Sequence, residues 1–343
     1  MKIVLDCHGG DNCPQAAVDG ALAALERLPE LELTLCGIER EIQTCLNGRA
    51  YDRDRLRILP AQDWISNEDS PTLAIRRKKT SSMVVALNSV AAGDADGIVS
   101  SGNTGALLAG AQLLVGRLPG VTRACLAPVM PTLEDGRDVV MVDGGANVDC
   151  RPDTYLEFAI MGDAFMRSVY GIASPRIGLL SNGAEAEKGN EATKLAHALL
   201  RESGLNFVGN VEARYVMNGV CDVLVTDGWA GNMALKSAEG MAHNLFEMMR
   251  RNIERGGLRA KLGYWLLRPA LRSVKRRMSS DEIGGGAFLG VRGVVVKAHG
   301  ASGAQAFCNA ILSAHKLARG YVVQRIAEGL SASRRVCADT ERA

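Results

Sequence analysis

Short aliphatic runs of strand type alternate with longer runs of helix type through most of this chain. This alternation most constrains its fold. Several of the short runs are apolar at successive positions, as is typical of strands covered on both faces. The strand candidates are Ile3–Asp6, Glu32–Cys36, Arg57–Leu59, Gly97–Ser100, Val139–Asp143, Arg176–Leu180, Asn206–Val208 and Asp222–Thr226. The pattern predicts an α/β fold, a doubly wound α/β/α sandwich with a mostly parallel sheet.

The helix candidates lie between these strands. They are Pro14–Leu28, Ser81–Ala92, Thr104–Val115, Thr154–Tyr170 and Glu191–Ser203. A longer helical stretch, Gly231–Met278, is interrupted near Gly256–Gly257 and at Pro269. We therefore predict one α/β catalytic domain over residues 1–333, as a single body or as two lobes around a cleft. It includes a protruding helical arm over 236–280 and precedes a frayed polar tail over 334–343.

Composition excludes several classes of protein. Aromatic residues make up only 4% of the chain, which disfavours base stacking on single-stranded nucleic acid. No long uncharged apolar run predicts a membrane span, and the N-terminus lacks the pattern of a signal peptide. The nine cysteines are scattered and form no Cys-x-x-Cys pair, which favours reduced thiols over disulfides or a zinc site. We expect a soluble cytoplasmic protein without a metal.

Clusters of Gly, Asn and Asp follow five of the predicted strands. In open α/β sheets, ligands bind outside the carboxyl ends of the strands, so these clusters mark the candidate site. They are His8-Gly9-Gly10-Asp11, Ser101-Gly102-Asn103-Thr104-Gly105, Gly144-Gly145-Ala146-Asn147, Ser181-Asn182-Gly183 and Gly228-Trp229-Ala230-Gly231-Asn232. Glycine lets the backbone approach an anion, and the following helix presents free N–H groups. Five such turns at one sheet edge predict an anion-binding crevice.

The sequence lacks two kinds of motif, and their absence limits the reactions that the site can catalyse. There is neither a Walker A loop nor a complete Gly-x-Gly-x-x-Gly pattern, which disfavours a nucleotide kinase or a simple dehydrogenase. No Gly-x-Ser-x-Gly elbow is present, so a bound phosphate could itself be the nucleophile in acyl transfer. Lys188, and Lys297 with His299, are the basic or titratable positions beside the turns, and His8 competes as a second acid–base candidate.

The turns, taken together and in order, resemble the bacterial phosphate:acyl-[acyl carrier protein] acyltransferases of phospholipid synthesis, the PlsX family. The resemblance extends from Met1 to about Glu328. The motifs that carry it are Ser100-Ser101-Gly102-Asn103-Thr104-Gly105-Ala106, Asp143-Gly144-Gly145-Ala146-Asn147, Lys188-Gly189-Asn190-Glu191 and Lys297-Ala298-His299-Gly300. His8, Ser181 and Ala186 depart from the family pattern at loops near the expected pocket.

The resemblance implies transfer of a fatty acyl group from acyl carrier protein to inorganic phosphate, without a cofactor or a metal. It also implies a fold like that of isocitrate dehydrogenase and phosphotransacetylase, a homodimer, and peripheral attachment to the inner face of the cell membrane. Lys188, His299 and Asn232 would be catalytic. The phosphate-binding residues would be Gly9, Gly10, Gly102, Asn103, Thr104 and Asn147.

The arm is strongly basic. From Arg250 to Arg277 there are ten Lys and Arg and one acidic residue, Glu254, a local charge of +9 in a chain of net charge +2. Cations flank an apolar aromatic tip, which suits an anionic lipid surface or an acidic carrier protein. The predicted contact residues are Arg259, Lys261, Trp265, Leu266, Leu267 and Arg268. Packing in a dimer interface is the alternative, and no motif accompanies the charge that would favour nucleic acid.

Two other functions stay open at this point. One is a phosphotransacetylase-like transfer that uses acyl-CoA. The other is a non-catalytic scaffold that binds anions and membranes.

Overall fold

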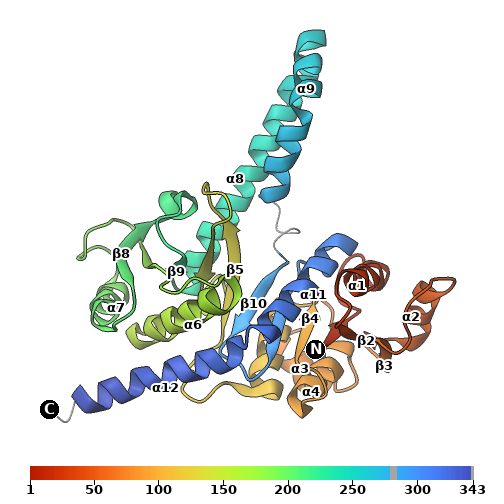
Figure 1. Ribbon diagram of the computed structural model, residues 1–343, viewed down its shortest axis with the longest axis horizontal. Coiled ribbons are helices and arrows are strands. Elements are labelled where there is room, and N and C mark those ends of the chain that lie inside the picture. Colours follow the sequence, from red (N-terminus) through yellow and green to blue (C-terminus); the bar gives the residue numbers. More distant parts are fainter. Residues whose placement is uncertain (279–283, 341–343) are drawn as a thin grey trace.

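The strands form one sheet whose two halves run in opposite directions. The computed structural model describes residues 1–278 and 284–340, and within them the strand order is β3-β2-β1-β4-β11-β10-β5-β6-β9-β7-β8. The strands are β1 Lys2–Asp6, β2 Glu32–Gly37, β3 Leu56–Pro60, β4 Gly97–Ser100, β5 Cys125–Pro131, β6 Asp138–Val142, β7 Ile177–Ser181, β8 Phe207–Glu212, β9 Val223–Val225, β10 Gly286–Leu289 and β11 Val294–Lys297. Figure 1 shows the two halves on either side of β10.

The reversal occurs at the two central strands. β10 is antiparallel to β11 and to β5, and β5 is antiparallel to β6, whereas every other pair of neighbouring strands is parallel. The mostly parallel sheet is therefore confirmed. The expectation that all five glycine-rich turns share one sheet edge is wrong, because the strands on the two sides of β10 and β5 point in opposite directions.

Helices cover both faces of the sheet. They are α1 Gln15–Arg27, α2 Glu39–Leu46, α3 Pro71–Arg77, α4 Ser82–Ala92, α5 Thr104–Gly110, α6 Pro152–Tyr170, α7 Glu191–Glu202, α8 Gly228–Arg255, α9 Gly257–Arg277, α11 Ala304–Arg319 and α12 Val322–Thr340. Ile3 and Leu5 of β1 pack into one core with α1 and α11, while Val4 packs into the other with α4. This alternation along one strand confirms the predicted three-layer arrangement.

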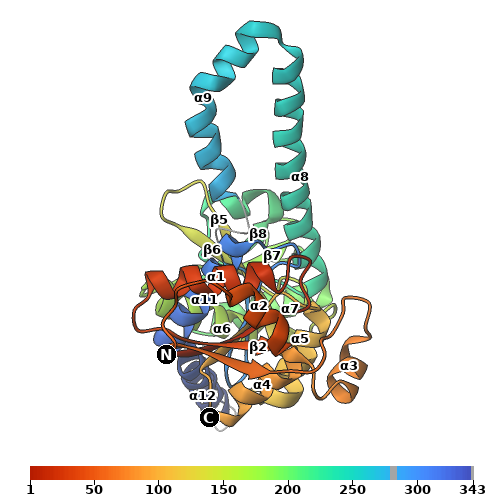
Figure 2. The ribbon, with the colours of Figure 1, turned by 90° about the vertical axis from the view of Figure 1, so that its right-hand side faces the viewer.

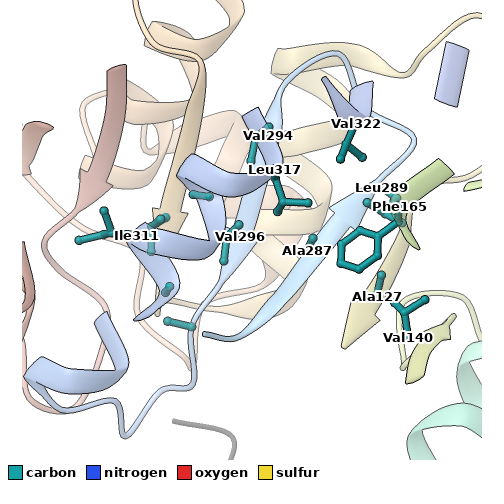
Figure 3. Close-up of a cluster of buried hydrophobic side chains, with 14 of the residues drawn as sticks. Ala127, Val140, Phe165, Ala287, Leu289, Val294, Val296, Ile311, Leu317 and Val322 are labelled. Atoms are coloured by element: carbon teal, nitrogen blue, oxygen red, sulfur yellow. The ribbon is translucent and has the colours of Figure 1, made fainter. Parts of the chain in front are cut away.

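The larger core lies beneath α1, α6 and α11. It joins the two halves of the sheet, because Ala127 of β5 and Ala287 of β10 belong to the same cluster as Phe165 of α6 and Ile311 of α11 (Figure 3). The small alanine side chains leave room for the Phe165 ring against the central strands. One continuous core therefore holds the antiparallel strands in place.

Helices α8 and α9 form the predicted arm, which projects well beyond the sheet (Figures 1 and 2). The first predicted interruption is confirmed, since Gly256 separates the two helices. The second is wrong, because α9 continues through Pro269. No residue of α9 is buried. The arm therefore has no core of its own within the described residues.

The ends of several elements also differ from expectation. The predicted helix Thr104–Val115 is α5 followed by a π-helical turn, Ala111–Gly116, and Ala213–Asn218 forms a 3₁₀ turn. The backbone of α12 is helical to Thr340, where a frayed tail was expected from residue 334, and 341–343 lie outside the described residues. The single catalytic domain over 1–333 stays a prediction.

Candidate active site

The candidate site is a pocket of about 310 Å³ between the two halves of the sheet. It is lined by Thr104, Leu126, Pro128, Val129, Gly144, Gly145, Asn232, Leu235, Lys236, Glu239, Gly285, Gly286, Lys297, Ala298, His299, Gly300, Ser302 and Ala306. These residues come from the ends of β4, β6 and β11, from β5 and the start of β10, and from the first turns of α8 and α11. The pocket therefore gathers turns from both halves, although their strands run in opposite directions.

The turn after β6 reaches the pocket by folding back over β5. A Cβ at Gly144 would lie 2.5 Å from the Pro128 ring, so only glycine fits there. The buried Asp143 holds this turn, since its carboxylate accepts backbone N–H bonds from Leu126 (2.9 Å) and Asn147 (2.7 Å). Burial acts to raise the pKa of Asp143, while these hydrogen bonds oppose the rise. The result is a rigid glycine turn.

Helix α8 begins directly against that turn. Asp227 caps the helix by accepting the N–H of Ala230 at 2.7 Å, and the N–H of Gly228 donates to the carbonyl of Asn147 at 2.6 Å. A Cβ at Gly231 would lie 2.1 Å from the carbonyl oxygen of Asp143. This contact brings Asn232 beside Gly145. The side of the first turns of α8 that carries Asn232, Leu235 and Lys236 thus faces the pocket.

Three turns from the other half pack tightly on one another. A Cβ at Gly9, whose φ is +90°, would lie 3.0 Å from the Cα of Gly102, and one at Gly10 would lie 2.3 Å from the Ser101 hydroxyl. The N–H of Asp11 also donates to the carbonyl of Gly300 at 2.9 Å. Gly9 thus lets its backbone approach that of Gly102, and Gly10 leaves room for the Ser101 hydroxyl. None of Gly9, Gly10 and Gly102 lines the pocket.

The two predicted asparagine ligands use their side chains within the protein. Asn103 caps α5 by accepting the N–H of Ala106 at 3.0 Å, and its amide donates to carbonyl oxygens of the 66–69 loop. Asn147 donates to the carbonyl of Ala124 at 2.8 Å and to Asp143 at 2.9 Å. Neither lines the pocket, whereas the predicted residues Thr104, Asn232 and His299 do.

Two lysines supply positive charge to the pocket wall. Lys297 is largely enclosed, and its ammonium group donates to the carbonyls of Ser101 (3.2 Å) and Ala298. Burial lowers the pKa of Lys297 to about 8, against the opposing effect of Asp6 and Asp11. Lys236 is exposed on α8 and pairs with Glu239 at 2.7 Å. The sequence placed Lys297 beside a predicted turn without assigning it a role, and Lys236 was not predicted. The spacing of four between Asn232 and Lys236 could have indicated the second, because it places both on one helix face.

His299 presents a hydrogen-bond donor. Its Nδ1 lies 3.3 Å from the N–H of Ala301, which assigns Nδ1 as the acceptor in the neutral ring. The proton of the neutral imidazole is then on Nε2. In this tautomer His299 can donate a hydrogen bond to a developing oxyanion.

Two other candidates lie outside the pocket lining. Lys188 is exposed on the loop between β7 and α7, and its stem lies against Gly183. His8 is buried, with Nε2 3.2 Å from Glu41 and its ring stacked on Trp64 at a centroid distance of 5.9 Å. His8 therefore faces α2 and Trp64 and does not line the pocket.

The predicted contact residues of the arm lie together on α9. Arg259, Lys261, Trp265, Leu266, Leu267 and Arg268 are all exposed. Within the described residues, no helix has the length and apolar content needed to cross a membrane. In the same residues, no group of three or more His, Cys, Asp or Glu is arranged to hold a metal ion.

Solved structures with a similar fold are phosphotransacetylases. The chain matches a phosphotransacetylase from Streptococcus pyogenes with a TM-score of 0.58 and 18% identity over 94% of both chains. It matches the EutD phosphotransacetylase from Staphylococcus aureus with a TM-score of 0.57 and 15% identity, over 95% of this chain and 94% of that one. At such low identity the likeness concerns the fold, and it confirms the predicted phosphotransacetylase-like architecture.

Sequence comparison gives the family. Residues 1–325 match the model of the family described as fatty acid synthesis protein. The phosphate acyltransferase of Shouchella clausii is 45% identical over 330 residues, which cover 96% of this chain and 98% of that protein. The phosphate acyltransferase of Clostridium acetobutylicum is 43% identical over 330 residues, covering 96% and 99%. The chain therefore belongs to the fatty acid synthesis protein family, which confirms the resemblance to the PlsX family and the prediction of an acyltransferase.

Proposed function

We propose that this protein transfers a fatty acyl group from the thioester of acyl carrier protein to inorganic phosphate. The products are acyl phosphate and free carrier protein. One observation carries the proposal: a single pocket combines Asn232 and Lys236 of α8, the glycine turn after β6 and the ammonium group of Lys297 with an apolar wall formed by Leu126, Pro128 and Leu235. The polar and cationic groups suit a phosphate, and the apolar wall suits the acyl chain beside it.

The phosphate would bind at the start of α8. Gly145 offers close backbone approach, Asn232 and Thr104 offer polar side chains, and Lys236 balances the negative charge. A phosphate oxygen held there would attack the thioester carbonyl directly, so no protein nucleophile is required. The Nε2–H of His299 would then donate to the oxyanion that forms on the carbonyl oxygen. We therefore propose Asn232 and His299 as catalytic residues.

The remaining predicted site residues fall into two groups. The first group would contribute to phosphate binding indirectly, by holding the turns that shape the pocket; it comprises Gly9, Gly10, Gly102, Asn103 and Asn147. Lys188 would act only if its loop brings the ammonium group to the bound substrate. Its four-carbon stem and its exposure make such a movement feasible.

The arm would bind the carrier protein that delivers the substrate and the membrane surface. The cations Arg259, Lys261 and Arg268 surround the apolar residues Trp265, Leu266 and Leu267 on α9. Such a surface would attract either the acidic carrier protein or anionic lipid. We assign the apolar residues to peripheral binding at the inner face of the cell membrane and the cations to both partners.

A second copy of the chain would cover the other face of α8. Met233, Met241, Leu245 and Met248 are each more than half exposed and recur at helical spacing along α8. A row of exposed apolar residues of this kind marks an interface, and methionine adapts well to a partner surface. We therefore assign this row to a homodimer. Met241→Glu with Met248→Glu should give a monomer by light scattering, whereas an unchanged dimer mass would contradict the assignment.

An assay of carrier thiol distinguishes the proposed reaction from its alternatives. Purified protein is incubated with palmitoyl carrier protein and phosphate, with sulfate in place of phosphate as the control. Phosphate-dependent release of free carrier thiol is expected. Turnover with palmitoyl-CoA alone would instead indicate a phosphotransacetylase-like transfer. Phosphate binding without turnover of either thioester would indicate a scaffold.

A further inference from the structure

Lys297 differs from the other cation of the pocket in its surroundings. Its ammonium group has three N–H bonds, of which two are donated to the carbonyls of Ser101 and Ala298. Within the described residues, the third has no acceptor. The side chain lines the pocket at the end of β11, two residues before His299. A fixed, enclosed ammonium group thus retains one hydrogen for a ligand.

The proposed reaction requires a proton donor at this place. When phosphate attacks the thioester, an O–C bond forms and the C–S bond breaks with its electron pair left on sulfur. A thiolate of an alkyl thiol is a poorer leaving group than the protonated thiol, since the thiol pKa is about 8.5. Monohydrogen phosphate carries one proton that must be moved from oxygen to sulfur for the products to be acyl phosphate and free thiol.

We propose that Lys297 is the general acid that protonates the departing sulfur of the carrier thioester. This inference rests on the proposed function of the pocket. The ammonium group transfers its free hydrogen to sulfur as the C–S bond breaks. The neutral amine then accepts the proton of the phosphate hydroxyl, which restores the lysine. One proton thus passes from phosphate through Lys297 to sulfur, and no other reactant is needed.

The groups that face Lys297 support this role. Burial is the main cause that lowers its pKa to about 8, which is close to the pKa of the thiol that it would protonate. Asp6 of β1 and Asp11 in the following loop act in the opposite direction, and Lys236 of α8 lowers the pKa further. His299 lies in the same loop with its Nδ1 occupied by the N–H of Ala301.

The neighbouring groups are less suited to the task. A neutral imidazole is a much weaker acid than an ammonium group, so the Nε2–H of His299 suits hydrogen bonding to an oxyanion. Lys236 is exposed and already pairs with Glu239 at 2.7 Å. Its position one turn after Asn232 instead suits the charge of phosphate.

The dependence of kcat on the leaving group of the thioester tests the proposal. Lys297→Arg keeps the positive charge but is a very weak acid. We expect it to lower kcat about 10²- to 10⁴-fold with an acyl-pantetheine thioester, and far less with an acyl thioester of a nitro-substituted thiophenol, whose anion leaves without protonation. Lys236→Met is the matched control and should lower activity equally with both esters. An equal loss with both esters in Lys297→Arg, or no loss, would overturn the assignment.

A measurement on the wild-type protein keeps the test independent of whether the variant folds. Activity with the alkyl thioester should fall as pH rises through about 8, because the acid loses its proton, while activity with the aryl thioester should not fall there. The same alkaline loss with both esters would refute the general acid and leave the acyl transfer intact. Absence of phosphate-dependent turnover with either ester would overturn the acyl transfer itself and the inference with it.

Discussion

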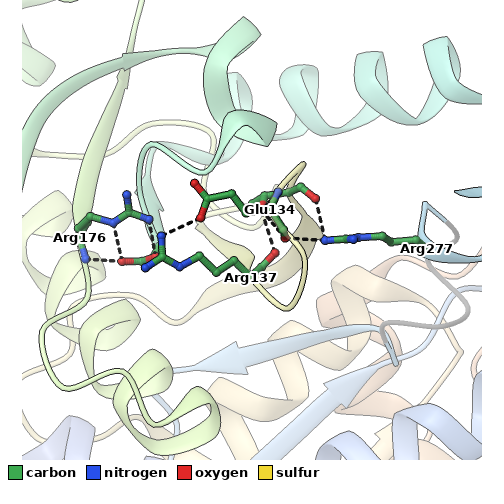
Figure 4. Close-up of polar contacts among 6 residues, drawn as sticks. Glu134, Arg137, Arg176 and Arg277 are labelled. Atoms are coloured by element: carbon green, nitrogen blue, oxygen red, sulfur yellow. Dashed lines mark hydrogen bonds and ion pairs between the residues drawn. The ribbon is translucent and has the colours of Figure 1, made fainter.

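The guanidinium of Arg277 donates a hydrogen bond of 2.9 Å to the carbonyl oxygen of Thr132, which ties the last residue of α9 to the hairpin between β5 and β6 (Figure 4). It also donates to the carbonyl of Glu134 at 2.6 Å and pairs with the Asp135 carboxylate. Because α9 buries no residue, this contact is the polar anchor of its base. The anchor bears on the site, since β5 also supplies Leu126, Pro128 and Val129 to the pocket wall.

We predict that Arg277→Met loosens this anchor. Hydrogen bonds from a charged donor contribute about 1.5–3 kcal/mol, whereas the pair with the exposed Asp135 adds little. Hydrogen exchange should therefore increase in the 132–137 hairpin, measured by mass spectrometry of the native protein. Lys275→Met, which removes an exposed cation two residues earlier, is the control and should leave the hairpin unchanged. Equal exchange in all three proteins would show that the arm is held by other contacts.

The pair of Arg176 and Asp222 predicts a pH-dependent stability. Arg176 donates from Nε (3.1 Å) and Nη2 (2.9 Å) to the carboxylate of Asp222, whose side chain is 4% exposed (Figure 4). Burial acts to raise the pKa of Asp222, but the hydrogen bonds and charge of Arg176 outweigh it, and the pKa is lowered. Its contribution is therefore present above the unfolded pKa, about 3.9, and is lost as pH falls through the folded pKa.

Arg176→Met should therefore destabilise the protein at pH 7 by about 3–5 kcal/mol, because it leaves a buried carboxylate without its partner. The loss should shrink as the pH is lowered towards 4, where the unpaired carboxyl can bind a proton. Urea denaturation at both pH values measures this. Arg214→Met, which breaks the solvent-screened pair with Glu212, is the control and should cost far less than Arg176→Met at either pH. A loss independent of pH would contradict the ionic origin of the effect.

The sequence predicted the strands and the turns of the site better than the contacts within it. Val139–Asp143 and its glycine turn were identified correctly, because a buried aliphatic run followed by Gly-Gly has few other structures available. Gly9 and Gly10 show the limit. Glycine signals a close approach to the backbone, which either a ligand or another turn can make, and in the structure another turn approaches Gly9 and Gly10. An isolated sequence pattern cannot distinguish these two causes.

The central strands were missed for a different reason. β5 contains Pro128 and Pro131, and proline is uncommon inside a sheet, while β10 begins in a run of glycines. Their pairing joins segments that lie far apart in the chain, and it reverses the direction of half the sheet. Local propensity carries no information on such a reversal. The placement of Lys297 beside Lys236 depends on it and could not be predicted from spacing.

Lys188 tests whether the loop between β7 and α7 takes part in the reaction. If its ammonium group stabilises charge in the transition state, Lys188→Ala should lower kcat about 10²-fold or more. Lys194→Ala, an exposed lysine on α7, is the matched control and should retain full activity. The carrier-thiol assay measures both variants. A wild-type rate for Lys188→Ala would remove this residue from the site and leave Lys236 and Lys297 as its cations.

Substitution of Asn103 tests whether the start of α5 and the 66–69 loop shape the pocket wall at Thr104. Asn103→Ala removes the cap of α5 and also both amide N–H donors, which three carbonyl oxygens of the 66–69 loop share. The lost cap alone should cost about 1 kcal/mol, and the loop carbonyls lose a donor in addition. We expect a lower midpoint of urea denaturation and a higher KM for phosphate, because Thr104 follows directly in the pocket wall. Asn103→Asp keeps the cap and should restore only part of the stability. An unchanged KM in Asn103→Ala would separate this loop from phosphate binding.

The exposed apolar residues of α9 give the sharpest test of membrane association. Trp265, Leu266 and Leu267 are 67%, 65% and 59% exposed. Transfer of these apolar side chains from water into a lipid interface is favourable in free energy. Replacing all three with Ser should abolish cosedimentation with vesicles that contain anionic lipid, while carrier-thiol release in solution continues, because the pocket lies in the body of the protein. Trp64→Ser, which removes an exposed aromatic residue from the body, controls for loss of apolar surface in general. High salt should weaken vesicle binding of the wild-type protein, since the flanking cations act through screened charge. Unchanged vesicle binding by the triple variant would assign the basic arm to the carrier protein or to the dimer instead of to lipid.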